Sequence, residues 1–180
     1  MSKKSLNNKN VMPKLVCGFI GQGWVGKNYA TDFEERGFSV IRYSKEAEYS
    51  HNKEAIASCG IVFIAVPTPT TPKGFDGSIL DDVLPLVGLG KTAVIKSTIL
   101  PGTTKKLQEK YPKKIILYSP EFLSEATAKY DTSNPFVSIV GMSKESKIHR
   151  KTAVCSVFQE ASNRASQSKR CLGTEISTGR

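Results

Sequence analysis

The 180-residue sequence predicts a doubly wound α/β fold, in which helices cover both faces of a mostly parallel, six-stranded sheet. Two observations point to this fold. Short apolar segments alternate along the chain with segments of helical periodicity, at the spacing of β-α-β units. The segment IVFIAVP, residues 61–67, is apolar apart from its proline end, as in a parallel strand that is buried on both faces. Right-handed crossovers between such strands place helices on both sides of one sheet.

Six short segments are expected to form the strands, because each is apolar or β-branched and ends at turn residues. They are KLVCGFIG (14–21), FSVIRYS (38–44), IVFIAVP (61–67), TAVIKST (92–98), KKIILYS (113–119) and PFVSIVG (135–141). The segment TPTTPKGFDGS (68–78) is rich in Pro, Gly and Thr and is expected to be a long loop.

The segments between the strands show helical periodicity or helix-end signals. Residues 24–36 carry Val25, Tyr29 and Phe33 at helical spacing, and Gly37 is a typical C-terminal stop. Further helices are expected at 78–88 with an interruption at Pro85, at 101–111 with Pro101 near the first turn, at 120–131, at 144–161, and as one short helix at most within 45–58.

The chain is expected to hold one domain at residues 14–161, a length that suits a single core. A polar leader at 1–13 is expected to be disordered, and residues 162–180 form a basic tail with little apolar content that is disordered or truncated. No apolar run reaches the roughly 18 residues of a membrane span, and no apolar segment follows the basic first residues as in a secretory signal. We therefore expect a cytoplasmic protein without a membrane partner.

The four cysteines form no Cys-x-x-Cys pair and have no zinc-site spacing with the two histidines. We interpret them as reduced thiols and predict no metal site. The formal charge of +10 fits either a solvated surface with a basic tail or a phosphate-bearing small ligand. Basic residues are not interleaved with aromatic ones, so we do not expect a nucleic-acid partner.

A glycine motif, GQGWVG, follows the first strand and opens the first helix, which is the context of a dinucleotide-binding Rossmann fingerprint. The first glycine allows the tight turn, the second lets a pyrophosphate approach the backbone, and the third lets the helix pack against the strand. Phosphates bind the unsatisfied N–H groups of such a helix N-terminus. A glycine turn without a ligand is the alternative. We predict cofactor contacts at Gly21, Gln22, Gly23, Trp24, Val25 and Gly26.

The choice between NAD and NADP stays open at this point. NAD-binding sites carry an acidic residue at the end of the second strand, where it binds the ribose 2′-hydroxyl. Here that position is Ser44, followed by Lys45, which favours a 2′-phosphate. Alternatively, Glu46 or Glu48 supplies the carboxylate from the next turn.

Four motifs in order, GFIGQGWVGK, IVFIAVPTPT, IKSTILPGTT and SPEFLSEATAKYD, resemble the N-terminal domain of the UDP-glucose/GDP-mannose dehydrogenase family over residues 14–141. UDP-glucose 6-dehydrogenases are the members with the most similar motifs. The resemblance implies oxidation of a sugar primary alcohol to a carboxylate with two NAD in turn, in nucleotide-sugar metabolism and polysaccharide biosynthesis. It also implies a nucleotide-sugar substrate, UDP-glucose or similar, and a homo-oligomer or further domains supplied in trans.

The resemblance also implies roles for matching residues. Thr98 would place a catalytic water, Glu121 would act in proton transfer, and Glu125 would touch cofactor and substrate. The nicotinamide side of the cofactor would contact the ends of the third and fourth strands, at Val66, Pro67, Thr68, Pro69, Thr70, Ser97 and Thr98.

The residues themselves are compatible with these roles. Val66, Ser97 and Ser119 each end an expected strand, where open α/β sheets bind their ligands. Ser119, Pro120 and Glu121 have the pattern of a helix start, and a helical turn would place Glu121 and Glu125 on one face. The helix N-terminus would then favour an ionised Glu121, as a general base requires. Early-helix glutamates are also common as plain partners of the helix dipole.

The sequence departs from the family pattern at Ser44, in the short connection between residues 43 and 61, and at the missing nucleophile. The family's central domain carries a Gly-x-Cys-x-Pro-Lys type motif, and Cys171, in KRCLGTE, does not match it. We therefore expect the central and C-terminal domains to be absent from this chain. The alternative is a stand-alone dinucleotide-binding module without turnover that acts through a partner.

Overall fold

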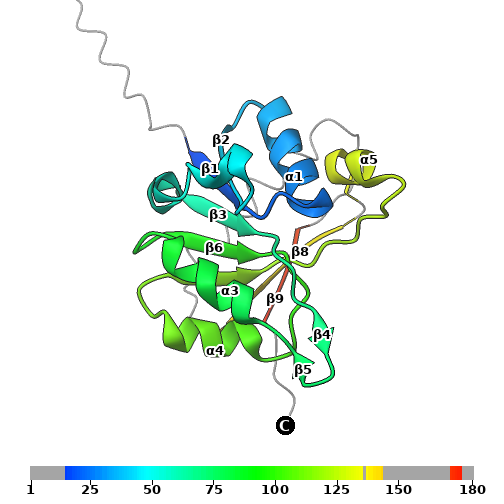
Figure 1. Ribbon diagram of the computed structural model, residues 1–180. Coiled ribbons are helices and arrows are strands. Elements are labelled where there is room, and N and C mark those ends of the chain that lie inside the picture. Colours follow the sequence, from blue (N-terminus) through cyan, green and yellow to red (C-terminus); the bar gives the residue numbers. More distant parts are fainter. Residues whose placement is uncertain (1–14, 136, 144–170, 176–180) are drawn as a thin grey trace, which may run out of the picture.

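The computed structural model describes residues 15–135, 137–143 and 171–175. In that part of the chain, seven strands form one sheet in the order β2-β1-β3-β6-β7-β8-β9 (Figure 1). Strands β2 to β7 of this order are parallel, β8 is antiparallel to β7, and β9 is parallel to β8. The strands are β1 (Val16–Ile20), β2 (Ser39–Tyr43), β3 (Ile61–Ile64), β6 (Thr92–Ile95), β7 (Ile115–Tyr118), β8 (Ser138–Met142) and β9 (Cys171–Glu175).

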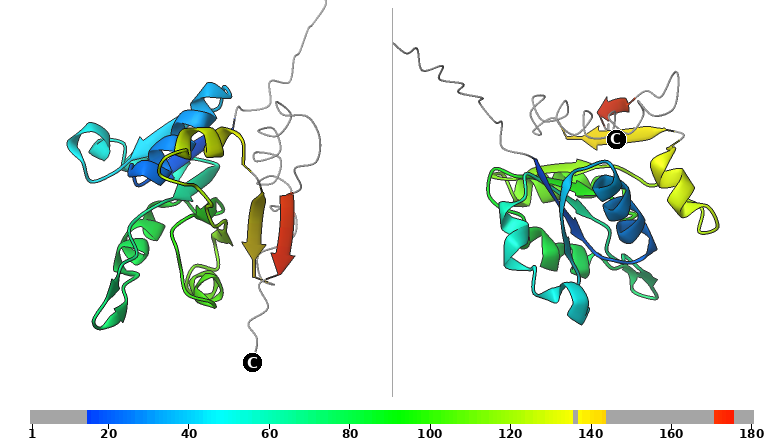
Figure 2. Two further views of the ribbon diagram at one scale, coloured as in Figure 1. Left: turned by 90° about the vertical axis from the view of Figure 1, so that its right-hand side faces the viewer. Right: turned by 90° about the horizontal axis from the view of Figure 1, so that it is seen from above.

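Helices lie on both faces of the sheet, as expected for a doubly wound fold (Figures 1 and 2). Helix α1 and helix α5 lie together on one face, and α3 and α4 lie on the other. The helices are α1 (Trp24–Glu35), α2 (Ala47–Ser50), the 3-10 turn η1 (Glu54–Ser58), α3 (Ser78–Val83), the 3-10 turn η2 (Leu84–Leu86), α4 (Thr103–Lys110) and α5 (Ala128–Ser133).

Two apolar layers, one on each face of the sheet, form the core. All four residues of β3 are buried, and they alternate between the layers. Ile61 and Phe63 pack on the α1 face, whereas Val62 and Ile64 pack on the α3 and α4 face. Successive strand residues point to opposite faces, so a strand covered on both sides is apolar throughout. This geometry accounts for the uninterrupted apolar run in the sequence.

Aromatic rings fill the layer under α1. The rings of Phe19 and Phe63 stack with centroids 4.9 Å apart, and Phe33 of α1 meets both edge-on at 5.2 and 5.0 Å. Such pairs are favourable beyond the apolar area that they bury. They fix α1 against β1 and β3, and so set where the N-terminus of α1 lies.

The six predicted strands are all present, and the first helix ends before Gly37, whose φ is +84°. The structure adds features that the sequence analysis did not place. Strands β4 (Thr70–Thr71) and β5 (Gly74–Phe75) form a small hairpin within the predicted loop at 68–78. The seventh strand, β9, lies within the segment predicted as a tail. The predicted leader at 1–13 and the helix at 144–161 lie outside the described residues.

Two helix starts differ from the prediction. Helix α4 begins at Thr103, after Pro101, because Gly102 adopts a left-handed conformation with φ of +84° just before it. The helix predicted for 120–131 begins only at Ala128. Across the described part of the chain, no helix combines the length and the apolar content needed to cross a bilayer.

Removing one central ring tests the importance of the aromatic layer. Phe63→Ala should lower the free energy of unfolding by about 3–5 kcal/mol, because the lost ring leaves a cavity between Phe19 and Phe33. Denaturant unfolding of the full chain measures the change. The control is Leu89→Ala, since Leu89 is 70% exposed and its truncation should cost less than about 0.5 kcal/mol. Equal losses for the two variants would contradict this account of the core.

Candidate cofactor-binding site

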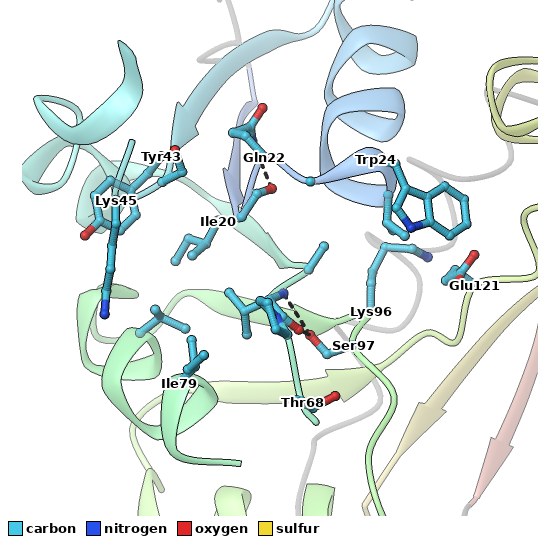
Figure 3. A pocket seen from close by; sticks show the side chains of 18 of the residues that line it. Ile20, Gln22, Trp24, Tyr43, Lys45, Thr68, Ile79, Lys96, Ser97 and Glu121 are labelled. Carbon is cyan, nitrogen blue, oxygen red and sulfur yellow. Dashed lines mark hydrogen bonds between the residues drawn. The ribbon is translucent and has the colours of Figure 1, made fainter. Parts of the chain in front are cut away.

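A cavity of about 610 Å³ opens at the carboxyl ends of the parallel strands (Figure 3). Open α/β sheets bind ligands at this edge. Its lining runs from the end of β2 past the β1–α1 turn to the ends of β3 and β6 and to the chain that follows β7. The lining residues are Ile20, Gly21, Gln22, Gly23, Trp24, Val25, Tyr43, Ser44, Lys45, Glu46, Ala65, Val66, Pro67, Thr68, Ile79, Val83, Lys96, Ser97, Thr98 and Glu121.

The three glycines of the motif differ in how much room surrounds them. Gly21 has φ of +89°, and a Cβ there would lie 2.2 Å from the Ala65 carbonyl oxygen. A Cβ on Gly26 would lie 2.0 Å from the Gly21 carbonyl oxygen. A Cβ on Gly23 would meet nothing within 4 Å. Gly21 and Gly26 are thus required by packing, whereas Gly23 leaves open space beside the cavity, where a ligand can approach the backbone.

The N-terminus of α1 brings N–H groups that have no partner within the helix to the cavity. Gly23 is its N-cap residue and provides no side-chain cap, and the first turn contains no acidic residue. The first N–H groups of a helix have no carbonyl partner within the helix, and the helix dipole adds partial positive charge there. Trp24 and Val25 of this turn line the cavity. An anionic group, such as a pyrophosphate, fits this position.

The Gln22 side chain is hydrogen-bonded to the backbone of the glycine turn. It is 8% exposed, and its amide donates to the carbonyl oxygens of Gly21 and Phe19 at 3.1 and 3.3 Å. Its Oε1 accepts a hydrogen bond from Arg42 of β2 at 3.3 Å, and Arg42 also pairs with Glu34 of α1 at 2.6 Å. The Gln22 side chain thus ties the glycine turn to β2.

The end of β2 brings the predicted ribose-binding residues to the cavity. Ser44, Lys45 and Glu46 all line it, whereas Glu48 does not. The Ser44 hydroxyl accepts a hydrogen bond from the Glu46 N–H at 3.3 Å, and the Lys45 and Glu46 residues are exposed. Of the two carboxylates considered for the ribose, only Glu46 therefore lies at the cavity.

Three hydrogen bonds made by side-chain hydroxyls join the chain after β3 to the chain after β6. The Ser97 hydroxyl donates to the Val66 carbonyl at 2.7 Å and accepts from the Val66 N–H at 2.9 Å. The Thr68 hydroxyl donates to the Thr98 carbonyl at 2.7 Å. These bonds hold both strand ends in one rigid wall of the cavity. Pro67 also lines the cavity, whereas Pro69 and Thr70 lie outside the lining.

The structure separates the two glutamates that the sequence analysis placed together. Glu121 lines the cavity, whereas Glu125 is exposed and does not. The prediction of a shared helix face is wrong, because residues 121–127 are not helical. The Glu121 carboxylate accepts the N–H of Leu123 at 2.8 Å, which closes a local turn in place of a helical one. The predicted effect of a helix N-terminus on Glu121 therefore does not arise.

Helix α5 begins later because its acidic residue organises the preceding turn. Asp131 accepts hydrogen bonds from the Thr127 hydroxyl at 2.6 Å and from the Ser124 N–H at 3.1 Å. These bonds lower the pKa of Asp131. The Ser124 N–H, which a longer helix would use, is bound here to the Asp131 side chain, so the chain from 121 to 127 stays irregular.

Sequence analysis missed one buried cation of the site, Lys96, at the end of β6. It is 3% exposed and lines the cavity, and its Nζ donates to the Ser119 carbonyl at 3.1 Å and to the Ser119 hydroxyl at 3.3 Å. Nζ also lies 4.1 Å from the centroid of the Tyr29 ring. Burial lowers the pKa of Lys96 to about 7, and the charge of Glu121 opposes this shift in part. The signal in the sequence was a lysine directly after the apolar run TAVI.

The cysteines within the described core are unreactive in character. Cys17 and Cys59 are free and buried, and burial raises the pKa of these thiols to about 12 and about 11. A thiol that stays protonated at neutral pH is a poor nucleophile and metal ligand. Cys171 lies in β9, and Cys155 lies outside the described residues.

Fold and cavity together define a dinucleotide-binding α/β domain with a glycine turn at a helix N-terminus. The family model for the NAD binding domain of the UDP-glucose/GDP-mannose dehydrogenase family matches residues 42–161. The chain therefore belongs to this family, as the four motifs predicted. The prediction of an NAD-binding domain is confirmed with it.

Individual relatives agree with this membership. A UDP-glucose 6-dehydrogenase of Campylobacter jejuni is 34% identical over 109 residues, which cover 58% of this chain and 28% of that protein. YtcA of Bacillus subtilis is 29% identical over 130 residues, or 64% of this chain and 30% of YtcA. The chain thus spans less than a third of the length of these relatives. The solved UDP-D-ManNAc dehydrogenase of Pyrococcus horikoshii shares the fold, with a TM-score of 0.76 at 17% identity over 91% of this chain and 48% of that one.

Two alanine substitutions test the distinct roles of the motif glycines. Gly26→Ala should lower the free energy of unfolding by about 1–3 kcal/mol or more, because the new Cβ collides with the Gly21 carbonyl. Gly23→Ala should change it by less than about 0.5 kcal/mol, because Gly23 has an extended conformation and open space around it. Denaturant unfolding of both variants checks this. A larger loss for Gly23→Ala would show that the turn packs differently.

The titration of Lys96 makes stability depend on pH in a known direction. The unfolded chain holds the Lys96 proton up to its ordinary pKa of 10.5, whereas the folded chain loses it near pH 7. Unfolding therefore takes up a proton between these values, and the free energy of unfolding rises with pH there. The free energy of unfolding of the wild type minus that of the Lys96→Met variant should be constant below about pH 6 and rise from pH 7 to 10. Chemical denaturation across this range measures it, and a flat difference contradicts a buried, easily deprotonated lysine.

Proposed function

We propose that the chain is the NAD-binding part of an enzyme that oxidises the primary alcohol of a nucleotide sugar, UDP-glucose or similar, towards the uronic acid. The observation that carries this proposal is the cavity at the strand ends. A glycine turn and a helix N-terminus lie on one side of it, and two hydrogen-bonded strand ends lie on the other. Membership of the family supports the reaction class.

The residues present fit an extended dinucleotide. Space for a pyrophosphate lies at Gly23, where a side chain would otherwise project, next to the free N–H groups of α1. Ser44, Lys45 and Glu46 would hold the adenosine ribose at the end of β2. Val66, Pro67 and Thr68 with Ser97 and Thr98 would hold the nicotinamide at the ends of β3 and β6. Bound NAD supplies a hydride acceptor at this second end.

The chain's own polar groups at that end would handle water and protons. Thr98 and Glu121 both line the cavity beyond the Ser97 hydrogen bonds. We assign Thr98 to orienting a water molecule and Glu121 to accepting a proton, with the carboxylate pinned by its bond from the Leu123 N–H. A carboxylate held within reach of a reacting hydroxyl can act as a general base. Glu125 has no role in this proposal, because it does not line the cavity.

The remaining parts of the reaction are assigned to other protein segments. Oxidation of an aldehyde to an acid needs a covalent or hydrated intermediate. The two described core thiols stay protonated at neutral pH and are poor nucleophiles for a covalent one. We propose that the nucleophile and the sugar and uridine contacts lie in the part of such enzymes that this chain does not span. The same proposal includes association of copies of the chain, a cytoplasmic location and a role in polysaccharide biosynthesis. The alternative is a stand-alone cofactor-binding module without turnover.

Thermal unfolding with added cofactor tests the proposed site. NAD at 100 times its dissociation constant should stabilise the full chain by about 2.7 kcal/mol, seen as a rise of several degrees in Tm. NADP titrated in parallel measures whether Ser44 and Lys45 prefer a hydroxyl or a phosphate. Gly23→Ala should keep the wild-type Tm without ligand but raise the Kd for NAD at least about tenfold, because its methyl group occupies the pyrophosphate space.

Two outcomes would contradict parts of the proposal. If neither dinucleotide shifts Tm, the cavity is not a working cofactor site. If Gly23→Ala binds NAD as tightly as the wild type, the pyrophosphate does not lie on the glycine turn. A turnover assay with UDP-glucose distinguishes an enzyme part from a stand-alone module. The chain is assayed alone and together with full-length relatives that are inactivated at their own NAD site.

A further inference from the structure

The buried cation Lys96 and the anion Glu121 lie at the same end of the cavity. Figure 3 shows the Lys96 side chain extending toward Glu121 beneath Trp24, while Tyr43 and Lys45 lie at the opposite end. Lys96 follows β6, and Glu121 lies three residues after β7. In the sheet order, β2 and β7 lie on opposite sides of β1, whose end carries the glycine turn.

This order fixes which half of a dinucleotide would lie near Lys96. The ribose of the adenosine is bound at the end of the second strand and the pyrophosphate at the glycine turn. The nicotinamide must then lie on the other side of the turn, toward the ends of β3 and β6 and toward Glu121. This step rests on the function proposed above. Only the oxidised nicotinamide ring carries a positive charge; the reduced ring is neutral.

A second positive charge at this end of the cavity is costly. Lys96 is 3% exposed, so water screens its charge poorly, and the charge–charge energy is larger than at a surface. The titratable groups around Lys96 come from three elements. Glu121, on the chain after β7, acts on Lys96 directly, and the Tyr29 ring of α1 lies against its Nζ. The charges of Asp32 of α1 and Asp131 of α5 act on Tyr29. Burial raises the pKa of Tyr29, and these three carboxylates raise it further, so the phenol stays neutral.

We propose that the Lys96 ammonium and the cationic ring of oxidised NAD are alternative positive partners of the Glu121 carboxylate. Oxidised NAD then binds with release of one proton from Lys96 to the solvent, whereas reduced NAD binds without this release. In either state, one cation then pairs with the Glu121 carboxylate. A neutral Lys96 still donates to Ser119 through its remaining N–H groups, so the loop that carries Glu121 keeps its place.

The low affinity of Lys96 for its proton makes this exchange possible near neutral pH. Burial, opposed in part by the charge of Glu121, brings the pKa of Lys96 to about 7, so a nearby cation has to remove only a proton that is already loosely held. Oxidation of an alcohol releases a hydroxyl proton along with the hydride. Once the ring charge is gone, Lys96 Nζ is a basic atom that can hold such a proton at this end of the cavity. Lys96 is therefore a positioning residue that links the cofactor's redox state to a proton.

Cofactor titrations of the full chain test this proposal without any turnover. The Kd for oxidised NAD should fall several-fold from pH 6 to pH 8.5, while the Kd for reduced NAD should rise or stay constant. Lys96→Met, which keeps the length of the side chain but carries no charge, should make the ratio of the two Kd values independent of pH. Lys105→Met, at an exposed position of α4, should leave the wild-type dependence intact.

Calorimetry of the wild-type chain supplies a test that needs no variant. Titrations at pH 6.5 in two buffers of different ionisation enthalpy should show net proton release with oxidised NAD and none with reduced NAD. A Kd ratio that does not change with pH in the wild type, or a Lys96→Met variant with the wild-type dependence, overturns the proposal while leaving the cofactor site intact. If neither form binds at any pH, the proposed function fails, and this inference fails with it.

Discussion

The close contact between helix α1 and the turn that precedes it is the constraint on which the site depends. The space between Gly26 and the Gly21 carbonyl is too small for a single methyl group, and Gly21 itself lies against the Ala65 carbonyl at the end of β3. These contacts place the N-terminus of α1 directly at the carboxyl edge of the sheet. The aromatic layer of Phe19, Phe33 and Phe63 holds the rest of α1 down. Because the helix end is fixed in this way, the first turn of α1 is already at the cavity before any ligand binds.

The opposite wall of the cavity depends on side-chain hydrogen bonds rather than on close packing. Ser97 satisfies both the N–H and the carbonyl of Val66, and Thr68 binds the chain after β6, so two loops behave as one surface. The buried ammonium of Lys96, which also lines the cavity, is bound to Ser119. The cavity therefore has a neutral, preorganised part at Val66 and Ser97 and a charged end at Lys96 and Glu121. That arrangement suits a ligand whose charge changes during the reaction.

The sequence predicted most of the fold because its strands are buried on both faces and its first helix carries apolar residues four positions apart, at Val25, Tyr29 and Phe33. The glycine motif was also informative, since packing requires two of its glycines, Gly21 and Gly26, and Gly23 leaves open space beside the cavity. The Glu121 and Glu125 pair was mispredicted for the opposite reason. Its helical pattern competes with side-chain to backbone bonds at Leu123 and Asp131, which spacing does not show. Lys96 was missed because its burial depends on which strands become neighbours in the sheet. The hairpin β4–β5 and strand β9 likewise depend on pairing between segments.

The central claim is that this cavity binds NAD along the strand ends, with the pyrophosphate on the glycine turn. Backbone amide NMR spectra of the full chain during an NAD titration test it most directly. The account predicts saturable shifts at the amides of Gly23, Trp24 and Val25 together with those of Val66 and Ser97, all with one dissociation constant. Amides of α4, none of whose residues lines the cavity, should not move. Saturable shifts confined to surface lysines, or a glycine turn whose amides stay unchanged at saturation, would contradict it.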